Sequence, residues 1–318
     1  MTGAATGRLC YVPGSLLLLD SASLYFRAFY GVPESVTAPD GTPVNAVRGF
    51  LDMVATLITR FRPARLVACL DADWRPAFRV AAIGSYKAHR LSAGGGEESP
   101  AALSPQVPVI EAALDALGLT RLGIAGYEAD DVIGTLVAHE HGAVDIVTGD
   151  RDLFQLVDDR GPVRVAYTGR GVRNLEVLDE AAVQHRYGIP GRAYGEFAVL
   201  RGDPSDGLPG VPGIGDKTAA ALIRHFGSVE ALLGALDSGE TAGFPAGTRT
   251  RLAAARDYLA VAPMVVRVAP DAPLPPYDDS LPAAAADPPA LVALCDKWGL
   301  DSSVERVLKA LEVAHAGP

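Results

Sequence analysis

The stretch Leu16-Leu17-Leu18-Leu19-Asp20 is a run of four leucines that ends directly in an aspartate. A run that is apolar at every position is typical of a parallel strand buried on both faces of its sheet. Ligands of open α/β sheets bind in the crevice beyond the carboxyl ends of the strands, where this aspartate would lie. The stretch therefore predicts a sheet covered on both faces, with an acid at its ligand-binding edge.

Four further segments place carboxylates where an apolar run ends, where a helix begins, or between two regions of the chain. They are Ala68-Cys69-Leu70-Asp71, Glu128-Ala129-Asp130-Asp131, Thr148-Gly149-Asp150-Arg151-Asp152 and Gly202-Asp203-Pro204-Ser205-Asp206. Taken singly, Asp20 and Asp71 are explained equally well as helix N-caps, and the acids at 128–131 equally well as first-turn acids that complement the helix dipole. Together, converging carboxylates repel one another and favour Mg²⁺ or Mn²⁺ as a counter-ion, and hence metal-assisted phosphoryl chemistry.

Composition places the chain among ordinary globular proteins. Its 318 residues are 49% hydrophobic and 21% charged, which is enough for two domains and unlike a disordered or fibrous chain. We expect a cytoplasmic protein without membrane contact, because the sequence shows neither an apolar stretch of about 20 residues nor a signal peptide. Cys10, Cys69 and Cys295 are too few and too far apart to predict a disulfide framework, and Cys69 is expected in a buried strand.

The net charge of −10 and the isoelectric point near 5.1 count against a nucleic-acid partner. An acid cluster without its metal ions accounts for most of this deficit, and bound divalent ions would reverse the local field. The net charge alone therefore does not exclude a nucleic-acid substrate.

The first half of the chain alternates strand and helix patterns. We predict strands at about 15–20, 65–70, 119–123 and 144–148, and helices at about 22–30, 45–61, 105–117 and 128–141. Helical turns at about 74–90 lead into a glycine-rich segment, 91–100, whose composition predicts a mobile loop. The alternation predicts an α/β fold with a parallel sheet covered on both faces.

Beyond about residue 180 the pattern becomes helical. The centre of this region is the glycine-rich turn at 210–219, which leads into a predicted helix at 219–226. Its spacing does not match a nucleotide-binding P-loop, and we interpret it as a contact to a duplex backbone, with Lys217 and Arg224 nearby. A Pro-, Ala- and Asp-rich connection at about 268–290 and short helices at about 288–297 and 302–313 follow.

Five motifs, in order, resemble the bacterial 5′-3′ exonuclease or flap endonuclease family, which includes the 5′-nuclease domain of DNA polymerase I. They are the segments at 20–28, 86–90, 126–134, 148–152 and 202–215, and the resemblance covers about residues 15–265. It implies a PIN-like nuclease domain at 1–180 with an arch or clamp loop at about 84–105. It further implies a helix-three-turn-helix DNA-binding domain at 181–265 and a C-terminal return to the nuclease domain at 266–318.

The resemblance also implies site residues. The acids that match the family's ligands for two or more Mg²⁺ or Mn²⁺ ions are Asp20, Asp71, Glu128, Asp130, Asp131, Asp150, Asp152, Asp203 and Asp206. Asp130, Asp131, Asp150 and Asp152 are expected innermost, and Lys87 and Arg90, on one helical face, are expected to contact the scissile phosphate. Residues expected to contact DNA are Arg27, Tyr86, Lys87, Arg90, Gly213, Gly215, Lys217 and Thr218, with Tyr86 stacking on a base and K⁺ bound near Val211 and Ile214.

The chain departs from the family pattern in two places. Pro204 and Gly207 alter the family's D-S-S-D-N motif, in which an asparagine commonly follows the second acid, and the loop from Leu91 to Ser104 differs from the usual arch. We predict a free-standing, monomeric nuclease that cuts DNA near 5′ flaps, nicks, gaps or overhangs in Okazaki fragment processing and repair. RNA primer–DNA hybrids are further candidate substrates. The alternative functions are those of a PIN-like ribonuclease and of a catalytically silent, structure-specific DNA-binding protein.

Overall fold

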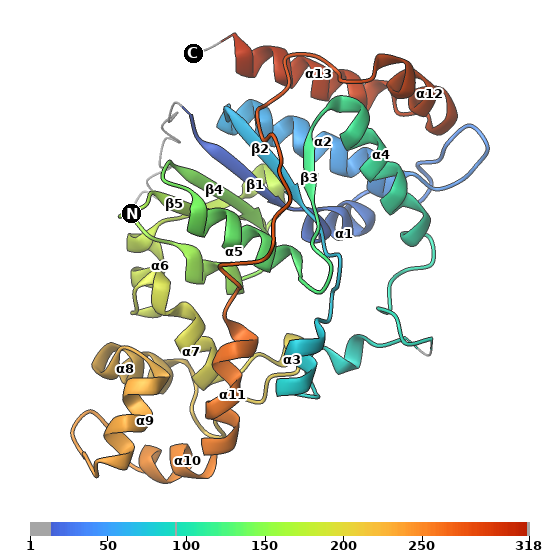
Figure 1. Ribbon diagram of the computed structural model, residues 1–318. Coiled ribbons are helices and arrows are strands. Elements are labelled where there is room, and N and C mark those ends of the chain that lie inside the picture. The colour runs from blue at the N-terminus through green and yellow to red at the C-terminus, as the bar shows by residue number, and fades with distance from the viewer. Residues whose placement is uncertain (1–13, 93, 317–318) are drawn as a thin grey trace, which may run out of the picture.

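The computed structural model describes residues 14–92 and 94–316, and its centre is one six-stranded sheet (Figure 1). The strand order is β3-β2-β1-β4-β5-β6. The strands are β1 (Leu16–Asp20), β2 (Arg65–Cys69), β3 (Thr120–Leu122), β4 (Val144–Thr148), β5 (Val163–Tyr167) and β6 (Glu176–Leu178). The sheet confirms the predicted α/β class and the four predicted strands.

Strands β5 and β6 were not predicted, and β6 corrects the expectation of a purely parallel sheet. It runs antiparallel to β5 at the edge, whereas all other pairs are parallel. The two strands gave little signal because β6 has only three residues and Arg164 interrupts the apolar pattern of β5, where it pairs with Asp145 of β4. An antiparallel edge strand on a parallel sheet is common in α/β folds.

Strand β1 is central because it is apolar on both faces. Leu16 and Leu18 pack into one hydrophobic core, while Leu17 and Leu19 pack into the core on the opposite face. All four side chains are at most 1% exposed. The alternation of side chains along a strand thus explains why the run contains no polar residue.

Helices cover both faces of the sheet (Figure 1). One face carries α1 (Ser21–Gly31), α2 (Asn45–Phe61), α4 (Val107–Leu117), α12 (Pro288–Trp298) and α13 (Asp301–His315). The other face carries α5 (Ala129–His139), α6 (Glu180–Tyr187) and α7 (Tyr194–Arg201). Helix α13 packs along α2, so the end of the described chain lies on the same side of the sheet as α1.

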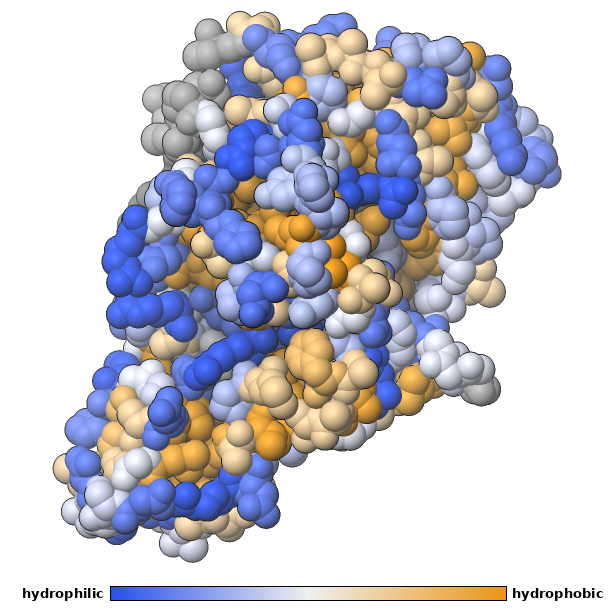
Figure 2. Space-filling view, in the orientation of Figure 1, coloured by the Kyte–Doolittle hydropathy of each residue, from blue (hydrophilic) through white to orange (hydrophobic). Residues whose placement is uncertain are grey.

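The remaining helices, together with the chain at 202–215 that leads into one of them, form a helical module beside the carboxyl edge of the sheet (Figure 1). They are α3 (Ala77–Ala82), α8 (Asp216–Phe226), α9 (Val229–Asp237), α10 (Thr248–Ala254) and α11 (Arg256–Val266). Helix α3 packs against α11, and Figure 2 shows apolar side chains gathered over α3. The domain boundaries near 180 and 265 stay predictions.

Two sequence expectations concern cysteines and membrane spans. Cys69 is a buried free thiol, as expected, and Cys295, for which no burial was predicted, is buried as well; Cys10 lies outside the described residues. In the part of the chain that the structure describes, no single helix is long and apolar enough to cross a membrane. Only the pair α8 and α9, bent by 78°, reaches the required length and apolarity when taken together.

Candidate active site

The carboxyl ends of the central strands bring the predicted acids together. Asp20 is the last residue of β1, and its carboxylate accepts hydrogen bonds from the Ser23 N–H at 3.1 Å and the Thr148 hydroxyl at 2.6 Å. Asp71 follows β2 and accepts the N–H of Ala129, at the start of α5, at 2.7 Å. Both aspartates therefore cap or brace helix starts and also point toward the edge of the sheet.

A cleft of about 230 Å³ opens at this edge. Its charged lining consists of Asp20, Asp71, Lys87, Arg90, Glu97, Glu128, Asp130 and Asp150. Burial raises the pKa of Asp20 to about 7, although the hydrogen bond from Thr148 acts in the opposite direction and lowers it. Burial and then the Asp150 carboxylate raise the pKa of Asp130 well above its usual range. The cleft thus concentrates negative charge that its own cations only partly balance.

A second acidic group lies where the sheet meets the helical module. Burial and then repulsion from Asp150 raise the pKa of Asp152 well above its usual range, and the charges of Asp206 and Asp203 act in the same direction. The Oδ1 atom of Asp152 is buried and has no hydrogen-bond partner. A buried carboxylate oxygen without a partner is costly, and a hard cation would satisfy it.

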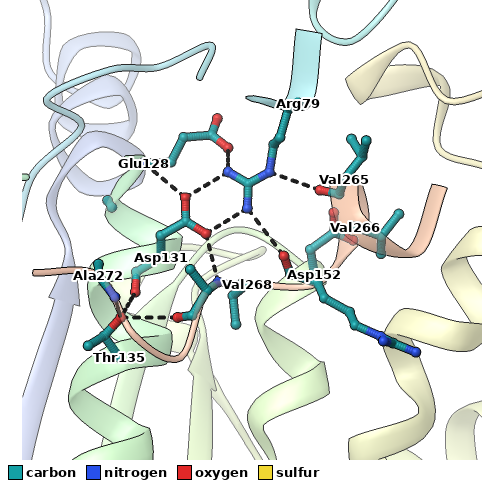
Figure 3. Close-up of polar contacts among 12 residues, drawn as sticks. Arg79, Glu128, Asp131, Thr135, Asp152, Val265, Val266, Val268 and Ala272 are labelled. Carbon is teal, nitrogen blue, oxygen red and sulfur yellow. Dashed lines mark hydrogen bonds and ion pairs between the residues drawn. The ribbon is translucent and has the colours of Figure 1, made fainter. Parts of the chain in front are cut away.

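The structure corrects the expected role of Asp131 (Figure 3). Asp131 is fully buried, and both of its oxygens accept from the guanidinium of Arg79, at 2.6 and 2.7 Å. The same oxygens also accept the N–H groups of Ala269 at 2.8 Å and Glu128 at 3.1 Å. With all its lone pairs engaged by protein groups, Asp131 braces the structure and does not face the cleft as an innermost ligand.

Arg79 is the residue that sequence reasoning missed. It is 2% exposed, pairs with Asp131 and Glu128, and donates to the carbonyls of Val265 at 2.9 Å and Arg267 at 3.3 Å at the end of α11 (Figure 3). One guanidinium thus joins α3, the acidic start of α5 and the end of α11. The only available signal was a single arginine within the otherwise uncharged segment 76–86.

Tyr86 also differs from expectation. Its side chain is 3% exposed, and its hydroxyl donates to Glu128 at 2.7 Å. Glu128 is paired with Arg79 and Lys87 as well, so its two oxygens serve three donors. The ring of Tyr86 is therefore closed to base stacking in this arrangement, and the tyrosine instead orients Glu128.

Lys87 and Arg90 do not lie on one continuous helical face. Helix α3 ends at Ala82, Lys87 has a left-handed backbone with φ of 47°, and Arg90 ends a short 3-10 turn. Lys87 pairs with Glu128, and Arg90 pairs with Asp206 at 2.9 Å. Both cations line the acid cleft even so, and the rest of the segment at 84–105, apart from residue 93, forms turns and short 3-10 helices without a helical arch.

The acids are not arranged as a finished metal centre. Within residues 14–92 and 94–316, no three His, Cys, Asp or Glu side chains have the spacing to hold one ion. The donor set nevertheless fits hard divalent cations, since it consists of carboxylate oxygens and includes the unpartnered Oδ1 of Asp152.

The glycine-rich turn opens α8, as predicted, three residues earlier than expected. Val211 and Ile214 are buried beneath the turn, while Gly213, Gly215 and Lys217 are exposed. The carbonyl of Gly213 accepts from Arg251 at 3.0 Å, a contact that nothing in the sequence indicated. A cavity of about 660 Å³ beside the turn has three basic side chains in its lining, Arg186, Lys217 and Arg224, together with the acid Asp216.

Arg27 lies on α1, beside the acid cleft. It lines a neighbouring cavity of about 840 Å³, together with Arg170 and Arg173, and its Nε is buried without a hydrogen-bond partner. Ser23 and Phe26 line both this cavity and the cleft. The two hollows are therefore adjacent, and the larger one places three arginines near the acids of the cleft.

An acid-lined sheet edge next to a helical module with a glycine-rich turn defines an α/β nuclease. Two family profiles match in succession: the 5′-3′ exonuclease N-terminal resolvase-like domain over residues 15–188 and the 5′-3′ exonuclease C-terminal SAM fold over residues 189–288. The chain belongs to the 5′-3′ exonuclease family.

Individual relatives agree with this assignment. A 5′-3′ exonuclease of Streptomyces coelicolor is 59% identical over 300 residues, which are 93% of this chain and 99% of that protein. A 5′-3′ exonuclease of Mycobacterium tuberculosis is 51% identical, with 93% of this chain and 98% of that protein covered. DNA polymerase I of Mycobacterium bovis is 42% identical over 70% of this chain but only 24% of its own length.

Solved structures share the fold. The phage T5 D15 protein, co-crystallised with metal ions, aligns with a TM-score of 0.59 at 17% identity over 94% of this chain and 99% of its own. The catalytic core of Rad2 in complex with DNA substrate aligns with a TM-score of 0.59 at 18% identity over 93% and 92%. These similarities support the fold, and the expected PIN-like sheet with its helical module agrees with it.

Proposed function

We propose that this nuclease is a divalent-metal-dependent 5′-3′ exonuclease and 5′-flap endonuclease that hydrolyses DNA where a 5′ strand leaves a duplex. The observation that carries the proposal is one cleft in which acids from β1, β2, α5 and the end of β4 meet Lys87 and Arg90. Beside it, the helical module presents a glycine-rich turn with basic side chains. The relatives named 5′-3′ exonuclease span nearly the whole chain, which supports the same activity.

The metal-binding part of the proposal rests on the carboxylates. Asp20, Asp71, Asp130 and Asp150 would hold ions in the cleft, and Asp152, Asp203 and Asp206 would hold ions at its border with the helical module. Bound Mg²⁺ or Mn²⁺ ions would supply an activated water and stabilise the leaving 3′ oxygen. The T5 flap endonuclease was crystallised with DNA and metal ions, and that observation on a structural neighbour supports the proposal.

Within the cleft the proposed phosphate ligands are Lys87 and Arg90. Their partners in this structure are Glu128 and Asp206, so a phosphate would compete with carboxylates for the same cations. Cations that contact the scissile phosphate stabilise the charge that develops in the transition state. Glu128, held by Arg79 and Tyr86, stays in place and orients Lys87 toward the cleft.

The helical module would hold the duplex without reading its sequence. The exposed start of α8, with Gly213, Gly215, Lys217 and Thr218, offers N–H groups and a cation to a phosphate. Potassium near Val211 and Ile214 and a DNA contact by Arg27 belong to the same proposal. So do a monomeric state and a cytoplasmic location, where replicating DNA is found.

The test uses a 5′-flap DNA, the matching RNA flap, and Mg²⁺ or Mn²⁺. We expect cleavage of the DNA, loss of cleavage in EDTA, and recovery when the ion is restored. Asp150→Ala should abolish cleavage, whereas Asp159→Ala, outside the cleft, should leave it intact. Cleavage that survives EDTA and Asp150→Ala would refute the metal mechanism, and cleavage of RNA alone would identify a ribonuclease instead.

A further inference from the structure

The segment that carries Lys87 and Arg90 is joined to the acidic turn at 203–207 by one backbone and two side-chain hydrogen bonds. The N–H of Lys87 donates to the carbonyl of Asp206 at 2.9 Å, and the Ser85 hydroxyl donates to the carbonyl of Gly207 at 2.9 Å. Arg90 donates to the carbonyl of Ser205 at 2.7 Å. Three bonds thus connect the helical module to the segment that positions both proposed phosphate ligands.

Gly207 makes this approach possible. Its backbone has φ of +72°, and a Cβ placed there would lie 2.2 Å from the carbonyl oxygen of Ser85. That separation is far below van der Waals contact, and the obstructing atom is backbone that a rotamer change cannot move. Any side chain at this position would therefore push residues 85–87 away from the turn.

Lys87 needs such a support because its own backbone is unfavourable. Its φ of +47° falls in the left-handed region, which costs a side-chain-bearing residue about 1 kcal/mol or more. Conformations of this kind persist where the surrounding structure over-determines them, and they recur at functional sites. The bond from the Lys87 N–H to Asp206 is one such constraint, and it depends on the close approach at Gly207.

We propose that Gly207 is a positioning residue for the cleavage reaction, because its missing side chain lets the 203–207 turn hold Lys87 and Arg90 at the cleft. The inference rests on the proposed role of these two cations. Gly207 touches no substrate and acts only through the backbone of residues 85–87.

The test compares Gly207→Ala with Gly239→Ala. Gly239 has φ of +78°, and a Cβ placed there would meet no atom within 4 Å, so its alanine variant carries the backbone strain without the collision. We expect Gly207→Ala to lower the single-turnover cleavage rate by about tenfold to a hundredfold, as small misplacements of catalytic groups do, with the Kd for flap DNA unchanged. Gly239→Ala should alter neither quantity.

Hydrogen exchange supplies a readout that does not depend on activity. The amide of Lys87 should exchange faster in Gly207→Ala than in the wild-type protein, with no change in Gly239→Ala. Ser85→Ala, at an exposed position, removes one of the three bonds without a collision and should slow cleavage to a smaller extent. This variant keeps the test informative should Gly207→Ala fail to fold.

Lys87→Ala separates this inference from the proposed function. In a Lys87→Ala, Arg90→Ala background, adding Gly207→Ala should slow cleavage no further. If Lys87→Ala slows cleavage but Gly207→Ala and Ser85→Ala do not, the positioning role of Gly207 is overturned and the proposed role of Lys87 is unaffected. Lys87→Ala and Arg90→Ala that both cleave at the wild-type rate would overturn the proposed roles of the cations themselves.

Discussion

Asp130 and Asp131 are neighbours in sequence with different surroundings. Asp130 lines the acid cleft, whereas Asp131 is fully buried and bonded to Arg79 through both oxygens. Removing one member of a buried ion pair leaves the other charge uncompensated, and that loss is larger than the net value of the pair. The two aspartates should therefore fail in different ways when they are substituted.

Asp131→Asn should destabilise the protein by up to about 3–5 kcal/mol, because the buried Arg79 guanidinium loses one of its two carboxylate partners and keeps only Glu128. Asp130→Asn should keep the stability of the metal-free protein or raise it, since it removes a carboxylate that repels Asp150 and Asp20. Urea unfolding in EDTA measures both effects. Equal stability of Asp131→Asn and the wild-type protein would contradict the bracing role, and full nuclease activity of Asp130→Asn would contradict its place in the cleft.

Lys87→Ala should slow the chemical step more than it weakens duplex binding. The expected loss is about 10²- to 10³-fold in single-turnover rate, which is typical when one donor to the transition state is removed. Lys217→Ala is the matched control, because it removes the same charge from the exposed start of α8. It should instead weaken duplex binding and lower the salt-dependence slope by about 1, with cleavage of bound substrate unchanged.

Between elements, the contact of α1 with α2 shows how closely the layer over the sheet is packed. A Cβ at Gly49 of α2 would lie 2.9 Å from both the Ala28 Cβ of α1 and the Val32 Cγ2 just after it. Helix α1 begins directly at Asp20, so this packing also fixes the strand end that carries an acid. The closeness of the two helices thus contributes to the geometry of the cleft.

Gly49→Ala should destabilise the protein by up to about 2 kcal/mol, because overpacking of about 1–3 kcal/mol exceeds the gain in helix propensity of about 1 kcal/mol. The control is Gly234→Ala in α9, where a Cβ would meet nothing within 4 Å. This variant should be more stable by about 1 kcal/mol from propensity alone. Thermal or urea unfolding measures both, and a stabilised Gly49→Ala would show that α1 can move away from α2.

Element prediction succeeded where one pattern extended over enough residues. The helix at 45–61 matches α2 at both ends because its apolar spacing runs for 17 residues. The segment at 74–90 was harder: it was expected to be helical, but only α3 and a short 3-10 turn form there. The N–H of Lys87 donates to the carbonyl of Asp206, and a contact between residues so far apart leaves no local pattern.

In the whole molecule, the acids meet because the sheet order places β2, β1 and β4 side by side. The helical module then adds Asp203 and Asp206, and Arg79 ties the end of α11 to the acidic start of α5. Repulsion among these carboxylates destabilises the folded state, and a cation that binds only the folded state would offset it. Ion binding should therefore raise the free energy of unfolding.

Addition of Mg²⁺ or Mn²⁺ to the metal-free protein should raise the free energy of unfolding by about 2.7 kcal/mol at an ion concentration about 100 times its Kd. Calorimetry or thermal melting at constant ionic strength measures the gain, with K⁺ as the control for screening. An Asp150→Ala, Asp152→Ala variant should gain far less. A wild-type protein whose midpoint does not respond to either divalent ion would contradict the proposed metal site.

The sequence by itself determined the α/β class, the helical module, the acids at the strand ends and the family, because these depend on local patterns and on motifs in a fixed order. The tertiary structure alone decided that Asp131 and Tyr86 face inward and that Arg79 joins three elements. It also decided that Gly207 brings the 203–207 turn against Lys87. Each of these depends on which distant side chain or backbone occupies the neighbouring space, and residue spacing along the chain carries no record of that.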